Sequence, residues 1–367
     1  MKKLLSAALI LFLLLFTCAC FPVSEEASAE VHFIDVGQAD SILILSGDSA
    51  VLIDAGTNSA GEDVLKYIKE QGVSKIDYLI GTHPHEDHIG GLDTVIEGLD
   101  IGEVIMPRHS SNTQTYEDVL LAAQSKGLKI TAAQAGNSFT AGECSFYILA
   151  PDGEYSNTNN YSVVMRMTVG NVSMLFTGDA ESQSEERMLE SGAHLKSDLL
   201  KIGHHGSDTS TSDQFLQAVS PKYAVISVGE NNSYGHLSVQ TLNKLSGIEL
   251  YRTDLMGTII ASTDGEEITF STEKGTKPTA ANPAQTAIIQ TAPAPSPITP
   301  SITASPELTP SSAPAESPSI IYIGNKNTLK FHLPTCSGLP DEANRIIFNS
   351  REEAVQAGMT PCARCNP

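Results

Sequence analysis

The stretch 82–88, which reads THPHEDH, holds the densest group of potential metal-binding side chains in the sequence. It contains three of the chain's 10 histidines together with two carboxylates. Neutral imidazole and carboxylate are the usual protein ligands of zinc and similar divalent cations. A solvated loop that is merely rich in histidine is the alternative, but the concentration of histidine argues against it. We therefore predict that His83, His85, Asp87 and His88 bind metal.

The surrounding sequence places this stretch at the end of a strand. Residues 76–81 form an apolar run typical of a buried strand, and a Gly-Gly pair followed by 92–96 indicates a turn into a helix. A loop at a strand end can turn several side chains towards one point.

Aspartates and histidines follow other predicted strands as well. They are Asp35, Asp54, Asp179, His204, His205 and His236. Any one of them alone is more commonly a cap or a surface residue. Together they indicate a shared site, because strand ends along one edge of an α/β sandwich can converge.

Apolar strands alternate with helical patterns from residue 31 to residue 272. Helical spacing covers 62–71, 116–126 and 181–190, and Gly170-Asn171 is typical of a hairpin turn. The alternation predicts an α/β fold for this region.

The pattern His83-x-His85-x-Asp87-His88 resembles the signature of the metallo-β-lactamase superfamily, whose fold is an αββα sandwich that usually binds two divalent metals. The resemblance implies that His83 and His85 hold one metal while Asp87 and His88 hold the other. It also implies that Asp179, after an apolar strand and Thr-Gly, bridges them.

The resemblance implies a last histidine ligand at a later strand end. His236 is our first choice for it, and His204 is the second.

A narrower resemblance covers about 31–272. The segments 33–40, 200–207, 226–236 and 254–265 look like the extracellular domain of ComEC-type DNA-uptake proteins. Those proteins also carry a transmembrane channel, for which we find no counterpart in this sequence. We therefore expect this chain to be similar to free-standing, secreted relatives.

One departure concerns a further histidine that most of the superfamily supplies to the first metal. The corresponding region, 157–162, reads NTNNYS, and His109 is poorly placed. We expect a weaker first site, or one completed by Asn160, Ser162 or water. One or two Zn²⁺ ions are expected, and oxygen-rich ligation makes Mn²⁺ or Mg²⁺ an alternative.

The expected chemistry is metal-assisted hydrolysis, because two cations lower the pKa of a shared water and stabilise charge on an ester or phosphoryl oxygen. Asp87 is the candidate to orient or deprotonate that water. Whichever of His204 and His205 does not bind metal could protonate the leaving group, or make a supporting hydrogen bond instead. Ser207 and Asn232 are candidates to hold a substrate oxygen.

The N-terminus has the pattern of a targeting segment. Two lysines precede an apolar run, and Cys20 follows a small residue, which resembles the lipobox of bacterial lipoproteins. We predict a signal peptide over 1–20, lipidation of Cys20 and a tether over 21–30. An ordinary signal peptide cut near 27–29 is the alternative. Either way we expect the mature chain on the outer side of the cytoplasmic membrane.

The C-terminal part reads as a spacer over 273–319, rich in Pro, Thr, Ser and Ala, and a small domain over 320–367. His332, Cys336, Cys362 and Cys365 have spacings that suit one structural Cys₃His zinc site. A disulfide is the alternative in an oxidising compartment.

The C-terminal segment resembles the metal-binding domain of Ada-type DNA repair proteins. In that family the first ligand is a cysteine that accepts a methyl group, and His332 stands in its place. We therefore expect a structural site, with DNA or cell wall as a candidate contact, and no methyl transfer.

We predict a secreted, lipid-anchored, metal-dependent hydrolase, a phosphodiesterase or nuclease acting on extracellular DNA. The formal net charge of −21 opposes a long nucleic-acid track and fits a small substrate better. The alternatives are a hydrolase of a lactone, a β-lactam or a cell-wall phosphodiester, and a non-catalytic metal-stabilised binding protein. No partner protein is evident.

Overall fold

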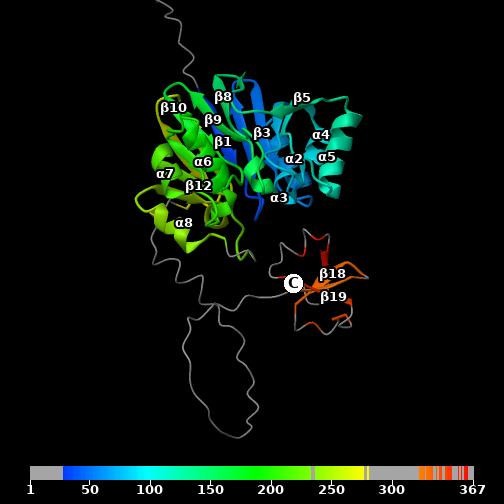
Figure 1. Ribbon diagram of the computed structural model, residues 1–367. Coiled ribbons are helices and arrows are strands. Elements are labelled where there is room, and N and C mark those ends of the chain that lie inside the picture. The colour runs from blue at the N-terminus through cyan, green and yellow to red at the C-terminus, as the bar shows by residue number, and fades with distance from the viewer. Residues whose placement is uncertain are drawn as a thin grey trace, which may run out of the picture. The chain divides into compact units, whose positions relative to one another are not determined.

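The computed structural model divides into two compact units, Met1–Ala294 and Pro295–Pro367 (Figure 1). It describes 28–232, 236–276, 279–280, 322–326, 328–333, 336, 339–340, 344–348, 354, 357 and 359–362. The predicted signal peptide, Cys20, most of the tether, most of the spacer and Cys365 lie outside these residues. Within them, no helix combines the length and the apolar character needed to span a membrane.

Two eight-stranded sheets form the large unit. The first has the order β15-β14-β1-β2-β3-β4-β5-β6 and the second the order β16-β13-β12-β11-β10-β9-β8-β7. The strands of the first are β1 (Ala29–Phe33), β2 (Ser41–Ser46), β3 (Ser49–Ala55), β4 (Lys75–Ile80), β5 (Asp100–Pro107), β6 (Ile130–Ala133), β14 (Ile259–Thr263) and β15 (Ile268–Thr272). Those of the second are β7 (Ser138–Ala141), β8 (Cys144–Ala150), β9 (Val164–Val169), β10 (Val172–Phe176), β11 (Leu199–Lys201), β12 (Tyr223–Ile226), β13 (Glu249–Arg252) and β16 (Thr279–Ala280).

Helices cover the outer face of each sheet, as Figure 1 shows. The helices of the first sheet are α2 (Gly61–Glu70), α3 (Glu86–Ile89), α4 (Leu92–Gly98) and α5 (Gln114–Ser125). Those that follow along the chain are α6 (Ser182–Glu190), α7 (Asp213–Val219), α8 (Val239–Lys244) and α9 (Thr253–Met256), with 3₁₀ turns η1 (Thr158–Tyr161) and η2 (His204–Gly206).

Three apolar cores separate the four layers. The central core joins the two sheets and includes Phe33 of β1 and Phe176 of β10. A second core packs α2, α4 and α5 on the first sheet. A third packs α6, α7 and α8 on the second sheet. The layers confirm the predicted αββα sandwich.

Parallel pairing brings the functional strand ends to one edge. Strands β3, β4, β5 and β6 run parallel to one another, and so do β10, β11, β12 and β13. The carboxyl ends of parallel strands meet at the same edge of a sheet. The loops after β4, β10 and β11 therefore come together where the two sheets adjoin.

Helices α2, α5 and α6 lie within two residues of their predicted ranges. Strand β7 was not expected, since Ser138–Ala141 lacks a sustained apolar pattern. The short strand β16 falls inside the range 273–319 that the sequence assigns to the spacer, and it pairs with β13.

The small unit contains a four-stranded sheet of order β19-β17-β18-β20. Its strands are β17 (Tyr322–Asn325), β18 (Lys330–His332), β19 (Arg345–Phe348) and β20 (Thr360–Pro361). Phe331, Phe348, Ala354 and Met359 form its own apolar core. It therefore has the small sheet and core expected of a separate domain.

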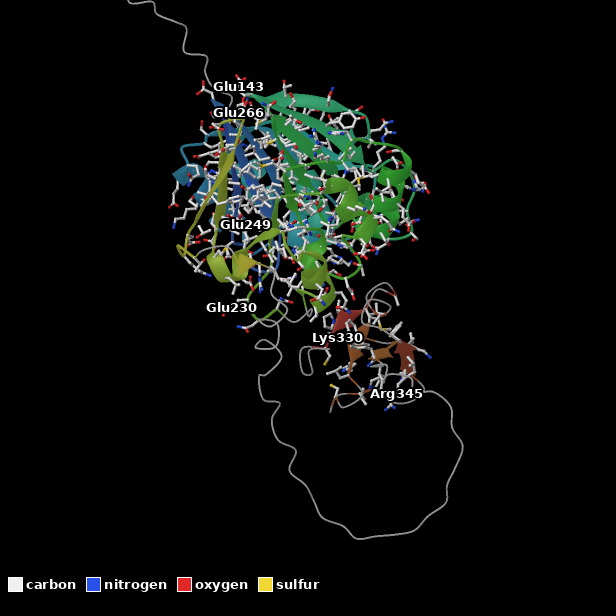
Figure 2. The ribbon with its side chains drawn as sticks, turned by 90° about the vertical axis from the view of Figure 1, so that its left-hand side faces the viewer. Glu143, Glu230, Glu249, Glu266, Lys330 and Arg345 are labelled. Atoms are coloured by element: carbon white, nitrogen blue, oxygen red, sulfur yellow. The ribbon has the colours of Figure 1, made fainter. Side chains whose placement is uncertain are left out.

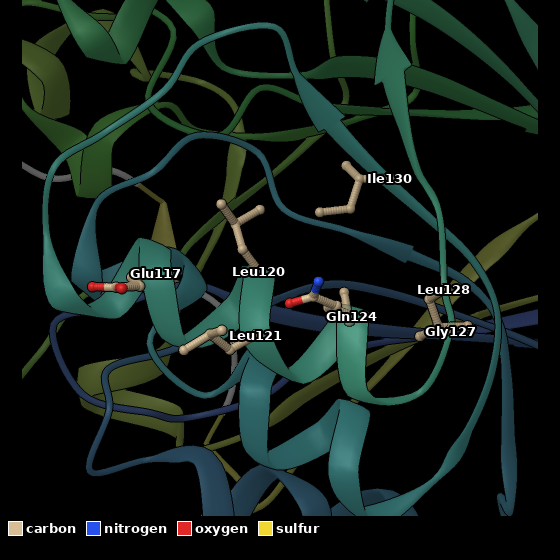
Figure 3. A pocket seen from close by; sticks show the side chains of 8 residues that line it. Glu117, Leu120, Leu121, Gln124, Gly127, Leu128 and Ile130 are labelled. Atoms are coloured by element: carbon tan, nitrogen blue, oxygen red, sulfur yellow. The ribbon is translucent and has the colours of Figure 1, made fainter.

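A surface pocket of about 480 Å³ lies on the large unit beside α5 (Figure 3). Leu120, Leu121 and Leu128 line it, and Leu121 is 52% exposed. None of the predicted site residues line this pocket. Truncation of Leu121 is consequently a suitable control for changes in the core.

Replacing Phe176 with Ala should weaken the docking of the two sheets. The Phe176 ring is buried, and its centroid lies 6.4 Å from that of Phe33 in the opposite sheet. Large-to-small changes of this kind cost about 3–5 kcal/mol of unfolding free energy. Leu121→Ala should cost less than about 1 kcal/mol. Urea unfolding in the presence of a chelator measures both, and equal losses would contradict a core that joins the sheets.

Candidate metal centre

The buried carboxylate of Asp179 lies at the centre of the converging strand ends. It follows β10 in a Thr-Gly-Asp turn. His88 Nε2 is 3.1 Å and His205 Nε2 is 3.8 Å from its Oδ1. His83 Nε2 is 3.9 Å and His204 Nε2 is 3.6 Å from its Oδ2. The two oxygens of Asp179 therefore face two different groups of imidazoles.

The Oδ1 side forms one compact set of donors. Asp87, His88, Asp179 and His205 each offer a ligand atom, and these atoms lie within 4.8 Å of one another. His88 Nε2, His205 Nε2 and Asp179 Oδ1 are buried, and none makes a hydrogen bond within the described part of the chain. Unsatisfied buried polar atoms are costly, so their convergence fits a bound cation.

Hydrogen bonds fix the tautomers of both imidazoles in this set. His88 Nδ1 lies 2.8 Å from Asp54 Oδ2, and His205 Nδ1 lies 3.0 Å from the Ser227 carbonyl oxygen. A carboxylate or carbonyl oxygen can only accept, so each Nδ1 carries the proton. In the neutral form of each ring, Nε2 therefore presents its lone pair to the centre, and this is the tautomer that a metal ligand needs.

Asp54 is held by the loop that it supports. Its Oδ1 accepts a hydrogen bond from the Thr82 backbone N–H at 2.8 Å, and its Oδ2 accepts one from the Thr82 hydroxyl at 2.7 Å. Asp54, the next-to-last residue of β3, thereby orients the His88 ring through a fixed carboxylate.

The Oδ2 side holds a second group of donors. His83 Nε2 and His85 Nδ1 are 3.0 Å apart. His83 Nδ1 lies 3.2 Å from the Thr82 hydroxyl and 3.3 Å from the Ser162 hydroxyl. Since the Thr82 hydroxyl donates to Asp54, it can accept from His83 Nδ1–H. That leaves His83 Nε2 with a lone pair facing His85 and Asp179.

The region expected to supply a further histidine supports the site instead. Ser162 Oγ accepts the Asp179 N–H at 3.0 Å. Asn160 Oδ1 accepts the N–H groups of Glu181 and Ser184, at 3.1 and 3.0 Å. Both residues thus fix the loop that carries Asp179.

His204 brings a third imidazole to the Oδ2 side. Its Nδ1 lies 3.2 Å from the Thr209 hydroxyl and 3.4 Å from Glu181 Oε1, so its Nε2 is directed to Asp179. His204 and His205 are adjacent in sequence, yet they approach opposite oxygens of one carboxylate. Both have positive φ angles, 49° and 51°, which turn the chain sharply between them.

His236 lies beside these histidines and outside the compact set. Its Nδ1 is 3.1 Å from Gln38 Nε2, and its ring centroid is 5.2 Å from that of His204. Burial, together with His204 and His205, lowers the pKa of His236 to about 4. Asn232 Oδ1 accepts the His236 backbone N–H at 3.1 Å, so Asn232 shapes this loop.

Ser207 is buried, and its hydroxyl lies 3.1 Å from that of Thr209. The predicted ligands His83, His85, Asp87, His88, Asp179 and His204 all lie around the centre. His205, which the sequence assigns to catalysis or support, joins the compact set, while His236 does not. The individual roles of these residues stay predictions.

The charges of the centre favour cation binding. Burial alone would raise the pKa of the Asp179 carboxyl, but His88, His204 and His205 hold that pKa well below its ordinary value. Burial alone would lower the pKa of His88, but Asp179, Asp54 and Asp87 raise it well above its ordinary value. The Asp179 carboxylate is thus ionised and attracts positive charge, which protons or metal ions can supply.

The small unit has its own donor set. His332, Cys336 and Cys362 are buried, and their ligand atoms lie within 4.8 Å of one another. His332 Nδ1 is 3.3 Å from Cys336 Sγ. Cys365, the fourth predicted ligand, lies outside the described residues. Two thiolates and an imidazole are donors that zinc prefers.

Residues 34–230 match the family model of the metallo-beta-lactamase superfamily, which covers more than half of the chain. The chain belongs to this superfamily. The metallo-beta-lactamase domain is followed by a match over 315–367 to the metal binding domain of Ada. Both predicted resemblances are confirmed, and the first domain is a metallo-beta-lactamase-fold hydrolase with a buried His/Asp metal site.

The metallo-beta-lactamase domain is related to competence proteins. ComE operon protein 3 of Bacillus subtilis (strain 168) is 33% identical over 267 residues, which are 67% of this chain and 34% of that protein. Competence protein ComA of Neisseria gonorrhoeae is 32% identical over 239 residues, which are 64% of this chain and 32% of that protein. The chain spans about a third of the length of these relatives.

Among solved structures, the metallo-beta-lactamase fold protein YhfI from Bacillus subtilis is similar, with a TM-score of 0.45 and 16% identity. The match covers 65% of this chain and 100% of that one.

Replacing Asp179 with Asn should release metal from both sides of the centre, because one carboxylate serves both groups of donors. We expect metal affinity to fall by at least about 100-fold, since loss of a residue that only supports a metal ligand already lowers affinity by 10–100-fold. Equilibrium dialysis against zinc or manganese, followed by elemental analysis of the full chain, measures the change.

Asp264→Asn, in the exposed turn between β14 and β15, is the matched control and should bind as much metal as the unaltered chain. Full metal content in Asp179→Asn would contradict the central position of this carboxylate.

Proposed function

We propose that the large domain is a two-metal phosphodiesterase that cleaves DNA outside the cytoplasmic membrane. The observation that carries the proposal is the position of Asp179, whose two oxygens face two separate groups of donors. Paired divalent ions, when bound there, would polarise a phosphoryl oxygen and activate water. Similarity to proteins named for competence supports DNA as the substrate class.

Asp87 is the proposed group that orients the attacking water and accepts its proton. Its carboxylate is 35% exposed and lies 3.3 Å from His205 Nε2, so it reaches both the centre and solvent. Burial opposes ionisation, but His88 and His205 lower the pKa of Asp87 below its ordinary value. The carboxylate form, which can take up a proton, is therefore the stable one.

His204 is the group that we propose to protonate the leaving oxygen. Its side chain is 22% exposed, whereas that of His205 is 1% exposed and has its Nδ1 bound to Ser227. Glu181 and Thr209 orient the His204 ring from behind. His205 is correspondingly assigned to metal binding.

The acidity of the chain limits how DNA can approach. Exposed glutamates such as Glu143, Glu230 and Glu266 spread over the large unit, as labelled in Figure 2. The formal net charge of −21 repels a long polyanion. Contact is therefore expected to be local to the metal ions, and hydrolysis of a small ester is the second candidate function.

We also propose that the chain works as a lipoprotein, attached through Cys20 and held away from the bilayer by the tether. The basic and apolar pattern of residues 2–20 supports this. The C-terminal unit is proposed to hold one structural zinc through His332, Cys336, Cys362 and Cys365.

A plate assay separates these functions. The mature protein is incubated with zinc or manganese on single-stranded and double-stranded DNA, bis(p-nitrophenyl) phosphate and nitrocefin. We expect metal-dependent cleavage of DNA and of the phosphate ester, lost by about 10⁴-fold or more in His85→Ala/Asp87→Ala, because ligand and base disappear together.

Exposed Asp264→Asn should keep full activity in the same plate. Turnover of nitrocefin without DNA cleavage would favour the small-ester function. Absence of metal-dependent cleavage from every substrate would reject the hydrolase mechanism proposed for these residues.

A further inference from the structure

A buried ion pair joins the two sheets next to the metal centre. Lys201, the last residue of β11, is 0% exposed, and its Nζ lies 2.9 Å from Asp40 Oδ2. The same Nζ donates to the Ile202 carbonyl oxygen at 3.0 Å. Asp40 is 2% exposed and directly precedes β2 of the other sheet. Each sheet thus contributes one charge to a pair closed off from solvent.

Asp40 contacts two of the three segments that supply the compact set of ligands. Its second oxygen, Oδ1, lies 3.5 Å from His205 Nδ1 and makes no hydrogen bond among the described residues. Its backbone N–H donates to the Asp87 carbonyl oxygen at 3.1 Å, and its own carbonyl accepts the Gly56 N–H at 2.8 Å. A displacement of Asp40 would consequently move Asp87 and His205 together.

Stability alone does not account for this pair. Taking two charges out of water costs several kcal/mol per ion, and apolar residues of similar volume are often as stabilising or more so. A lysine in the apolar stretch LLKIG therefore points to another role. The negative charge beside Nδ1–H of His205 adds to the Ser227 carbonyl in favouring the tautomer with a bare Nε2.

We infer that Asp40 and Lys201 are positioning residues for the metal ion held by Asp87, His88, Asp179 and His205. Asp40 orients His205 and the Asp87 loop, and Lys201 fixes and neutralises the Asp40 carboxylate. Because the partners belong to different sheets, this ion binds fully only when the sheets are docked. The inference deepens the proposed two-metal site and rests on it, but it does not depend on the substrate.

The test compares three variants of the full chain, Asp40→Asn, Lys201→Met and Asp40→Leu/Lys201→Met. The tail site is first filled with one equivalent of zinc, and cobalt is then titrated while its visible absorption is recorded. We expect all three to bind the ion on the His83/His85 side normally and the ion of Asp87, His88, Asp179 and His205 about 10–100-fold more weakly, with an altered spectrum, as when metal-ligating histidines lose their hydrogen-bond partners.

The double variant separates positioning from folding. It leaves no unpaired buried charge, so its thermal stability without metal should be close to that of the unaltered chain. Recovery of ion binding at Asp87, His88, Asp179 and His205 together with stability would overturn the inference. Should the double variant fail to fold, the answer comes from Asp40→Asn, checked by circular dichroism. Unchanged binding of both ions in a folded Asp40→Asn would likewise overturn it.

Arg252→Met/Asp254→Leu is the matched control, since it removes a second largely buried ion pair from the end of β13, which lies two strands from β11 in the same sheet. Among the described residues, neither partner makes a hydrogen bond or ion pair with a metal-site histidine, and cobalt binding should be unchanged. Fewer than two large-domain ions in the unaltered chain would contradict the proposed two-metal site itself. Two ions with no effect of the variants would reject the positioning role alone.

Discussion

The burial of the Asp179 carboxylate is the constraint on which the rest of this structure depends. An isolated anion in a protein interior is very costly unless opposite charge or hydrogen bonds compensate it. Here four imidazoles approach its two oxygens, and the Ser162 hydroxyl accepts its backbone N–H. Those groups come from the ends of β4 and β11 and from the loop before β9, so both sheets must be in place before the charge is compensated.

The same requirement explains why packing and chemistry are linked in the large unit. Phe33 and Phe176 belong to the core that holds the sheets together. Phe176 is the last residue of β10, three positions before Asp179. The ion pair of Lys201 and Asp40 makes a second connection between the sheets, close to His205. Apolar burial thus brings the sheets together, and buried polar contacts set their alignment at the metal centre.

Much of the fold and half of the centre could be predicted from the sequence, because they are local. The HPHEDH run lies in one short loop and the helix α3 that follows it, directly after one apolar strand, and helices such as α2 follow a clear 3.6-residue period. Asp179 could be predicted for the same reason, because it closely follows an apolar strand in the sequence. Strand β7 was missed because Ser138–Ala141 mixes polar and apolar residues without a regular pattern.

The remaining part of the centre depends on long-range geometry. Nothing in the letters HHGS indicates that positive φ angles send His204 and His205 to opposite sides of Asp179. The supporting roles of Asp54, Glu181 and Asp40 likewise arise from contacts between distant strands. Lys201 left one detectable signal, a single charge inside an apolar strand, which is unusual for a buried position.

Anomalous diffraction from crystals grown with manganese or zinc tests the central claim most directly. We expect two peaks in the large domain, one on each side of the Asp179 carboxylate and about 3.5–4 Å apart, as in two-metal hydrolase sites. One peak should be ligated by Asp87, His88 and His205, and the other by His83 and His85. Peaks located away from Asp179, or none at all in a folded and metal-saturated protein, would contradict it.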